Sequence, residues 1–348
     1  MEPGGQWGHW QWPGQTPDGS PGLKMRPAMC RPLPGSGRFP TPQGTSIVKW
    51  VFVFLFLASA VYVHFRGRVR HRLGRQLLDH STFMAPVNVL MYAFSRVPTT
   101  AFIPEPGEHF PELEPLRANW QTIREEARRL RELQHIKAAE GYNDVGFNSF
   151  FRRGWKRFYL KWYDDAHPSA AELCPRTTAL LRQIPSVKAA MFTELPPGGE
   201  LRPHRDPFAG SLRLHLGLET PNDDACFIEV DGNRYSWRDG QWTMFDETFI
   251  HSARNDTRSN RIILFCDVER PMKYRWAQAL NRFIARNLIA AGASPNMEGD
   301  KTGGINRLFK YFYVLRLKAK GLRERNKGLY YGLKYLAVVL VAAFIIWL

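Results

Sequence analysis

Two long apolar stretches lie near the ends of the chain. Residues 47–65 are apolar except for Lys49, Ser59 and His64. At about 1.5 Å per residue, a helix of this length approaches the ~30 Å thickness of a hydrocarbon core. Residues 329–348 form the second stretch, which a single lysine interrupts. The pattern predicts transmembrane or membrane-embedded helices at both places.

The residues that flank the first apolar stretch differ on its two sides. Residues 1–46 are rich in Gly, Pro and Gln and show no helical or strand period, so we expect a disordered tail. A cluster of arginines follows the stretch: Arg66, Arg68, Arg70, Arg72 and Arg75. This cluster predicts that the following domain faces the cytoplasm. A cleaved signal peptide is the alternative, but the small-residue cleavage pattern is missing.

The central part of the chain begins with mixed helical and strand patterns. Apolar residues recur with a period near 3.6 over 111–139 and 169–184, which predicts helices. Aromatic residues alternate over 146–151 and 158–163, which predicts strands.

From Val187 onward, short apolar runs alternate with turn residues. Asp231-Gly232 and Asp239-Gly240 are hairpin signals between such runs. The runs are 187–195, 212–218, 226–230, 234–237, 242–245 and 261–268. Many short antiparallel strands of even spacing predict a mainly β fold with flanking helices, whose core is a double-stranded β-helix, or jelly roll, at about 187–270.

The charge of the chain is strongly positive and unevenly placed. The 48 Lys and Arg residues against 32 Asp and Glu give a formal charge of +16, which favours a polyanionic partner. Residues 310–327 mix basic and aromatic side chains directly before the second apolar stretch. A solvated basic helix or a nucleic-acid patch is possible, but this position favours anionic membrane lipid, and no nucleic acid is expected as a partner.

The cysteines indicate neither a metal cluster nor a disulfide framework. Cys30, Cys174, Cys226 and Cys266 are scattered without C-x-x-C spacing. We expect small buried hydrophobic residues in a reducing compartment.

Candidate metal ligands gather between Leu201 and Arg261. His204 and Asp206 are one residue apart, so in an extended segment both side chains leave the same face. His251 can lie opposite them in a jelly roll. Two imidazoles and one carboxylate are a ligand set that holds ferrous iron, and it leaves positions for two oxygens of a keto acid and for O2.

Other polar residues in the same stretch are expected inside the fold. Arg261 begins an apolar strand, where a buried guanidinium needs a carboxylate. A dicarboxylate cosubstrate would satisfy it; the alternative is a structural ion pair with Asp246, Glu247 or Asp267. Arg213 and His215 share one face of a strand, and either line the interior or form a satisfied core pair.

The runs Pro203–Arg213, Phe245–Thr248 and Arg261–Phe265, together with His251, resemble the aspartyl/asparaginyl β-hydroxylase family. The likeness extends upstream through 81–86, 146–151 and 154–158, and is strongest to the membrane-bound lipid A hydroxylase branch. Asp206 matters here, because the animal protein-modifying branch has glycine at this place.

The resemblance implies a double-stranded β-helix dioxygenase that uses Fe(II), 2-oxoglutarate and O2. It would hydroxylate C2 of a secondary acyl chain of lipid A, or of its acylated precursor, at the cytoplasmic face of the bacterial inner membrane. The implied metal ligands are His204, Asp206 and His251. The implied cosubstrate-binding residues are Arg261, Arg213, His215 and Thr193.

The residue patterns, with the resemblance for the central domain, set the predicted organisation of the chain. The segments are a tail at 1–46, a transmembrane helix at 47–65, a basic juxtamembrane connector at 66–110, a dioxygenase domain at 111–275, a basic amphipathic membrane-surface segment at 276–328 and a transmembrane helix at 329–348. Candidate walls of an acyl groove are Phe147, Phe150, Phe151, Trp155, Phe158 and Trp162, and the alternative is that these aromatic residues pack in the core. Expected lipid phosphate contacts are Arg152, Arg153, Lys156 and Arg157.

Two other functions fit the same residues. A membrane-anchored aspartyl/asparaginyl protein hydroxylase would use the same metal site on a peptide. A non-catalytic cupin-like module would bind metal without turnover of 2-oxoglutarate. The sequence leaves the oligomeric state, the acyl-chain length and the modified position open.

Overall fold

The structure is a computed structural model that describes residues 43–77, 79–139, 143–163 and 166–347. The chain divides into two compact units, Met1–Ile47 and Val48–Leu348. Most of the predicted tail lies outside the described residues, and helix α1, Gln43–Phe65, begins before the predicted apolar helix. Of the four cysteines, Cys174, Cys226 and Cys266 are free and buried, as expected, and Cys30 lies outside the described residues.

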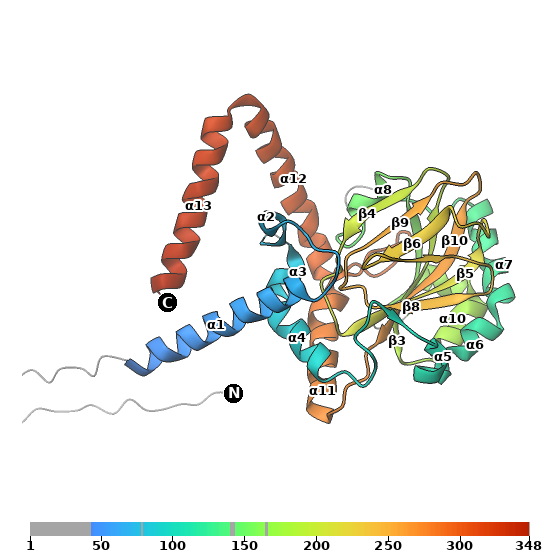
Figure 1. Ribbon diagram of the computed structural model, residues 1–348. Coiled ribbons are helices and arrows are strands. Elements are labelled where there is room, and N and C mark those ends of the chain that lie inside the picture. The colour runs from blue at the N-terminus through green and yellow to red at the C-terminus, as the bar shows by residue number, and fades with distance from the viewer. Residues whose placement is uncertain (1–42, 78, 140–142, 164–165, 348) are drawn as a thin grey trace, which may run out of the picture. The chain divides into compact units, whose positions relative to one another are not determined.

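Two antiparallel sheets form the centre of the second unit (Figure 1). The larger has the order β1-β8-β5-β10-β3-β2 and the smaller has the order β4-β9-β6-β7. The strands are β1 Phe102–Ile103, β2 Lys156–Trp162, β3 Val187–Leu195, β4 Glu200–His204, β5 Ser211–Glu219, β6 Cys226–Val230, β7 Asn233–Ser236, β8 Trp242–Phe245, β9 His251–Asn255 and β10 Arg261–Glu269. From β3 to β10 the chain passes back and forth between the sheets, which is the arrangement of a double-sheet jelly roll. The predicted mainly β fold with flanking helices is confirmed.

Side chains along the central strands point alternately towards the covering helices and towards the space between the two sheets. In β5, the leucines at 212, 214, 216 and 218 are fully buried against helices, whereas Arg213 and His215 face the space between the sheets. The same alternation in β10 sends Leu264 to the helices and Phe265 to the space between the sheets. A two-residue period therefore gives one sheet an apolar outer face and a partly polar inner face.

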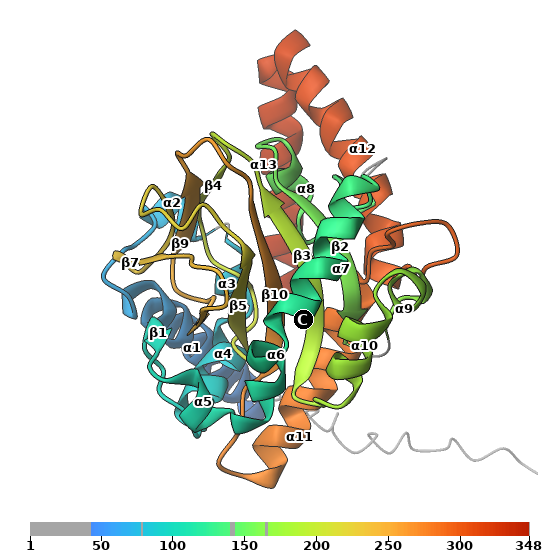
Figure 2. The same ribbon diagram turned by 90° about the vertical axis from the view of Figure 1, so that its right-hand side faces the viewer.

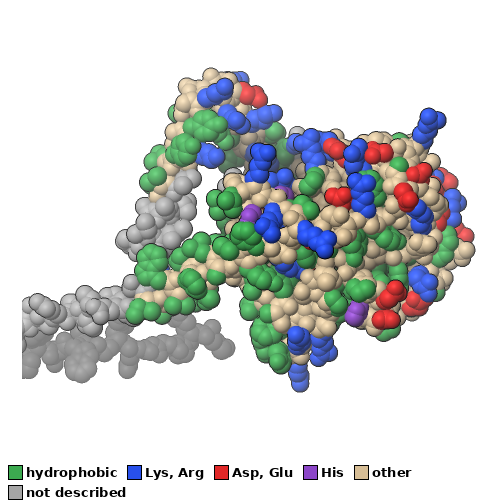
Figure 3. Space-filling view, viewed as in Figure 1, with side chains coloured by type: hydrophobic (Ala, Val, Ile, Leu, Met, Phe, Trp, Pro, Cys, Tyr) green, Lys and Arg blue, Asp and Glu red, His purple; other side chains and the backbone are tan. Residues whose placement is uncertain are grey.

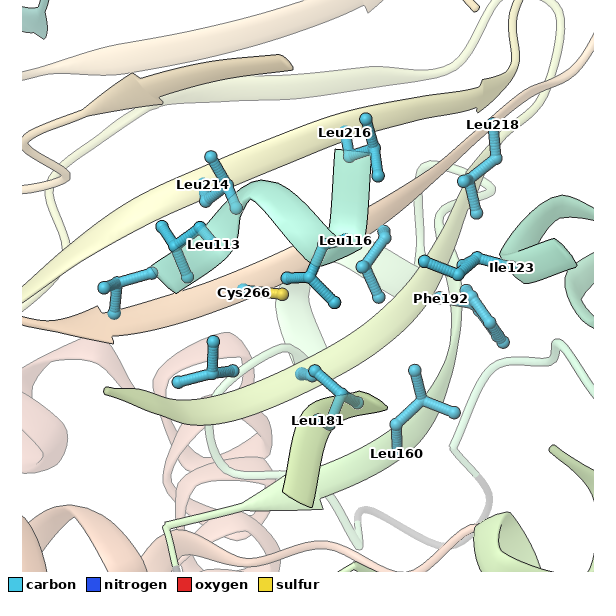
Figure 4. Close-up of a cluster of buried hydrophobic side chains, with 14 of the residues drawn as sticks. Leu113, Leu116, Ile123, Leu160, Leu181, Phe192, Leu214, Leu216, Leu218 and Cys266 are labelled. Carbon is cyan, nitrogen blue, oxygen red and sulfur yellow. The ribbon is translucent and has the colours of Figure 1, made fainter. Parts of the chain in front are cut away.

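Helices cover the outer face of the larger sheet (Figure 2). They are the 3₁₀ turn Pro111–Leu113, α6 Glu114–Ala118, α7 Trp120–Glu132, α9 Pro168–Leu173 and α10 Pro175–Arg182. Figure 4 shows leucines of β5 packed against this layer. The two long predicted helices are broken. The first is interrupted at Asn119, and the second is divided before Pro175, which has no N–H to donate to the preceding turn.

Some strand predictions were wrong. Residues 146–151 contain a short helix, α8 Asn148–Phe151, because the Asp144 carboxylate accepts the N–H of Phe147 and starts a helical turn. The Asp231-Gly232 hairpin is confirmed between β6 and β7, with φ of 52° and 82°. Asp239-Gly240 instead joins β7 to β8, which belong to different sheets. Strands β4 and β9 were missed because they have no apolar run.

Short helices follow α1 along the chain, and longer ones close it. They are α2 Leu73–Gln76, α3 His80–Phe83, α4 Ala85–Ala93, α5 Pro106–His109, α11 Arg275–Ile284, a π turn Ala285–Ile289, a 3₁₀ turn Ala290–Gly292, α12 Gly304–Arg325 and α13 Lys327–Trp347. Within the described part of the chain, one helix is long and apolar enough to cross a bilayer, at Ile47–Phe65. The second span stays a prediction: its residues are helical, but the last side chains of α13 lie outside those described.

Candidate metal centre and its cavity

Strand pairing brings the three candidate metal ligands together. His204 ends β4 and His251 begins β9, and these two residues are direct partners in the antiparallel ladder. The centroids of their rings are 4.2 Å apart. Asp206 follows β4 in a loop, where its N–H donates to the carbonyl of Glu247. One ligand atom from each of the three residues lies within 4.8 Å of the others.

Hydrogen bonds orient both imidazoles for metal binding. Nδ1 of His204 lies 2.7 Å from the carbonyl oxygen of Arg202, and Nδ1 of His251 lies 3.0 Å from that of Phe249. Because a carbonyl only accepts, each Nδ1 carries the proton and each Nε2 keeps its lone pair. Burial lowers the pKa of His204, and burial with the neighbouring His204 lowers the pKa of His251 to about 3. Both rings are therefore neutral, as metal ligands must be.

Arg213 holds the carboxylate of the site. Its Nη2 donates to Oδ2 of Asp206 at 2.8 Å, and its guanidinium also contacts Glu247 and Asp267. Burial acts to raise the pKa of Asp206, but Arg213 and the two imidazoles outweigh it and lower that pKa to about 2. Arg213 therefore positions the ligand carboxylate, and its implied role in cosubstrate binding stays a prediction.

The carboxyl groups around Arg213 do not all keep their negative charge. Two buried carboxyl groups, Glu247 and Asp267, and the half-buried Asp206 face a single guanidinium. Burial raises the pKa of Glu247 well above its usual range and also raises the pKa of Asp267, whereas the pKa of Asp206 is lowered, so the negative charge stays on Asp206. One ionised carboxylate beside two neutral imidazoles is a donor set that fits a divalent metal ion.

Buried polar groups without partners lie in the same cavity as two of the three ligands. His204 and His251 line this cavity together with Thr193, His215 and Arg261, and Asp206 is bonded to Arg213 in the cavity wall. The Thr193 hydroxyl, both nitrogens of His215, and Nε and Nη2 of Arg261 have no hydrogen-bond partner among the described residues. An unpaired buried polar group costs free energy of folding. Several of them in one cavity therefore indicate that the cavity binds a polar ligand.

The alternative ion pairs proposed for Arg261 do not form. Asp246 is engaged by Arg66 and Arg270, while Glu247 and Asp267 are engaged by Arg213. Arg261 is only 2% exposed, and its guanidinium lies over the Trp237 ring at 4.5 Å. Burial lowers its pKa to about 10, so it remains charged near neutral pH. A buried cation of this kind fits the distal carboxylate of a small dicarboxylic acid.

Some of the predicted acyl-groove residues line this cavity and others do not. Phe147, Phe150 and Trp155 do, and the Phe150 ring lies 4.8 Å from that of His204. Phe158 is fully buried in the cluster beneath the helices, so its assignment as a groove wall was wrong. Nε1 of Trp162 donates to the carbonyl of Ile289, away from the cavity. Phe151 packs on the outer side of Trp155.

The four basic residues proposed for lipid phosphates all have partners within the protein. Arg157 is buried and bonded to Asp144 at 3.0 Å, so its assignment to a phosphate was wrong. The other three pair as Lys156 with Glu194, Arg152 with Tyr313 and Arg153 with Glu200.

Three residues at the site have partners that the sequence did not indicate. Arg66, grouped with the juxtamembrane arginines, is buried between the rings of Tyr92 and Phe249 and donates to Asp246 at 2.7 Å. Glu247 and Asp267 were named as possible partners of Arg261 and instead contact Arg213. Asp267 shares the inner face of β10 with Arg261, so strand alternation could have placed it inside the fold.

Comparison with known proteins agrees with this geometry. Residues 117–271 match the family described as aspartyl/asparaginyl beta-hydroxylase. The resemblance to this family is thereby confirmed. Ornithine lipid ester-linked acyl 2-hydroxylase of Rhizobium tropici is 35% identical over 153 residues, which cover 42% of this chain and 54% of that protein. Aspartyl/asparaginyl beta-hydroxylase of Homo sapiens is 28% identical over 162 residues, which cover 45% of this chain and 21% of that protein.

Other relatives are more distant or only partly matched. Aspartate beta-hydroxylase domain-containing protein 2 of Homo sapiens is 28% identical, with 57% of this chain and 54% of that protein covered. The chain thus spans about half or less of the length of these relatives. A Pseudomonas putida prolyl-4-hydroxylase structure aligns with a TM-score of 0.30 at 17% identity, covering 44% of this chain and 88% of that one.

Replacing Arg213 tests the electrostatics of the site. Arg213→Met leaves the buried Glu247 and Asp267 and the half-buried Asp206 without their cation, so we expect it to lower the free energy of unfolding by about 3–5 kcal/mol. Arg234→Met is the matched control, because Arg234 pairs with Glu229 on the surface, and a change of at most about 0.5 kcal/mol is expected. Denaturant unfolding of the full chain in detergent measures both; equal effects would contradict the role given to Arg213.

Proposed function

We propose that the chain is a membrane-bound Fe(II)/2-oxoglutarate-dependent hydroxylase that acts at C2 of a lipid acyl chain. The observation that carries the proposal is the cavity in which two of the three clustered metal ligands, His204 and His251, lie with the unpaired Arg261, Thr193 and His215. The specific substrate we propose is a secondary acyl chain of lipid A or of its acylated precursor. The Rhizobium relative, named for acyl 2-hydroxylation of ornithine lipid, supports an acyl substrate.

Different residues of the chain would bind the metal and orient its ligands in such a reaction. When bound, Fe(II) with 2-oxoglutarate and O2 supplies the oxidation that places one oxygen atom on the substrate carbon and yields succinate and CO2. His204, Asp206 and His251 would hold the metal on one side only, and Arg213 keeps the Asp206 carboxylate ionised and oriented.

The cosubstrate would be bound by the unpaired groups of the cavity. Arg261 and Thr193 leave the same face of adjacent strands, since Thr193 pairs with Ile263 two residues along β10. Together they offer a charged fork and a hydroxyl to one carboxylate. His215 also lines the cavity and is neutral, because burial with Arg261 and Arg213 lowers its pKa well below its usual range.

An apolar wall beside the metal ligands suits an acyl chain. Phe147, Phe150 and Trp155 form it, with Phe150 against the ring of His204. The apolar wall would orient a methylene group towards the metal and exclude water from the site. A peptide substrate is the alternative, suggested by the relatives named for aspartyl and asparaginyl hydroxylation.

Lipid analysis tests the function directly. Cells that contain the protein should yield lipid A heavier by one oxygen atom on one acyl chain, and cells that lack it or carry Asp206→Ala should not. The substitution removes one metal ligand at a loop position, so the folded fraction should be retained. Mass spectrometry of lipid A and of ornithine lipid separates the two lipid substrates. Unmodified lipids in aerobic cells that contain the folded protein would contradict acyl hydroxylation.

The role of Arg261 has its own test. Arg261→Met should weaken binding of 2-oxoglutarate to the Mn(II)-loaded protein by about 10- to 100-fold, because one carboxylate loses a charged donor. Arg261→Lys keeps the charge but not the fork, so its affinity should be intermediate. Calorimetric titration gives these values. If Arg261→Met bound 2-oxoglutarate with unchanged affinity, Arg261 would not be a binding residue for the cosubstrate.

We further propose that the domain faces the cytoplasm at the bacterial inner membrane and contacts anionic lipid. Figure 3 shows apolar side chains along α1 and Lys and Arg side chains where α12 meets α13. Trp276 and Phe283 of α11 are 52% and 64% exposed, and aromatic residues of this kind suit the membrane surface.

The side of the membrane can be tested by protease treatment. Protease added to intact spheroplasts should leave the domain after α1 uncut, and lysis should expose it, because the bilayer shields a cytoplasmic domain. Cleavage of the domain before lysis would place it on the other face.

A further inference from the structure

The loop that carries Asp206 is supported by residues far away in the sequence. This ligand loop, residues 205–209, follows β4 and leads to β5. Its contacts with the jelly roll include the bond from the Asp206 N–H to the Glu247 carbonyl, the ion pair of Asp206 with Arg213 and the bond from Arg270 to the Ala209 carbonyl. Because the loop lies outside the strand ladders, further partners are needed to hold its backbone and the metal ligand in place.

Those partners come from the connector that follows the membrane helix. Nη2 of Arg75 in α2 donates to the carbonyl of Pro203 at 2.8 Å. Nε2 of His80 in α3 donates to the carbonyl of Arg205 at 2.6 Å. These two carbonyls flank His204, so two short helices fix the backbone on either side of a metal ligand.

Asn88 of α4 makes the most complete contact. Its Nδ2 donates to the carbonyl of Pro207 and its Oδ1 accepts the N–H of Ala209, both at 2.9 Å. The side chain is fully buried, so both bonds are shielded from water. One amide thus closes the loop on the far side of Asp206, as a strand partner would.

The same loop is tied to the end of α1. The Arg205 side chain, 1% exposed, sends Nη1 to the carbonyl of Val63 at 2.8 Å. A cation at the C-terminal end of a helix is favoured, and it satisfies a carbonyl that the helix leaves free. The residue between the two candidate ligands of the loop therefore binds the last turn of the membrane helix.

We propose that Arg75, His80 and Asn88 form a clasp that positions His204 and Asp206 for metal binding, so that the connector after the membrane helix is a working part of the metal centre. The clasp rests on the proposed metal site, and its residues act through the backbone of the ligand loop. Groups that orient ligands in this way typically change metal affinity by about 10- to 100-fold when removed.

Metal binding by the full chain in detergent tests the clasp. Asn88→Ala should weaken Mn(II) binding, followed by the paramagnetic resonance signal of free Mn(II), about 10- to 100-fold. Asn296→Ala is the matched control: Asn296 makes the same pair of bonds to a backbone, at Tyr159 of β2, which carries no metal ligand. It should lose similar thermal stability while keeping the affinity of the unsubstituted protein.

Milder variants keep the test decisive if Asn88→Ala does not fold. Asn88→Asp retains the acceptor for Ala209 and should give intermediate affinity, and Arg75→Ala, at an exposed residue, should weaken binding several-fold. Unchanged Mn(II) affinity in the folded variants, or an equal loss in Asn296→Ala, would overturn the clasp. Failure of the unsubstituted chain to bind Mn(II) would instead overturn the metal site on which the proposed function depends.

Discussion

The buried guanidinium of Arg213 is the interaction on which the site depends. It contacts Asp206, Glu247 and Asp267, which come from a loop, the turn after β8 and strand β10. Burial of several charges is unfavourable unless each is paired, so these segments can meet only with Arg213 between them. The same contact aligns the Asp206 carboxylate and keeps it ionised beside the two imidazoles. Arg213 therefore contributes both to the stability of the fold and to the geometry of the candidate metal site.

Strand alternation explains how such a polar centre coexists with a large apolar core. The leucines of β5 and every second residue of β10 pack against the covering helices, while the residues between them face the smaller sheet. The jelly roll therefore encloses a cavity without giving up the apolar face that stabilises it. Arg261, Thr193 and His215 remain unpaired in that cavity, which is costly in a folded protein unless a ligand satisfies them.

The segment that follows α1 packs against the jelly roll. Arg66 lies between Tyr92 and Phe249 and pairs with Asp246, which Arg270 also binds. These contacts place the end of α1 directly against the turn after β8 that leads to His251. An enzyme acting on a lipid would gain from this arrangement, because the anchor and the metal centre share one rigid support.

The sequence by itself determined the apolar anchor, most strands of the jelly roll and the identity of the three candidate ligands. Each of these is set by local pattern or by residue type, as in the alternation of β5 or the spacing of His204 and Asp206. Only the tertiary structure decided which charged residue meets which: that Arg213 serves Asp206, that Arg157 and Arg66 are buried in ion pairs, and that Arg261 has no carboxylate. Such pairings join residues far apart in the chain, so they follow from strand register and helix packing, which local sequence patterns do not encode.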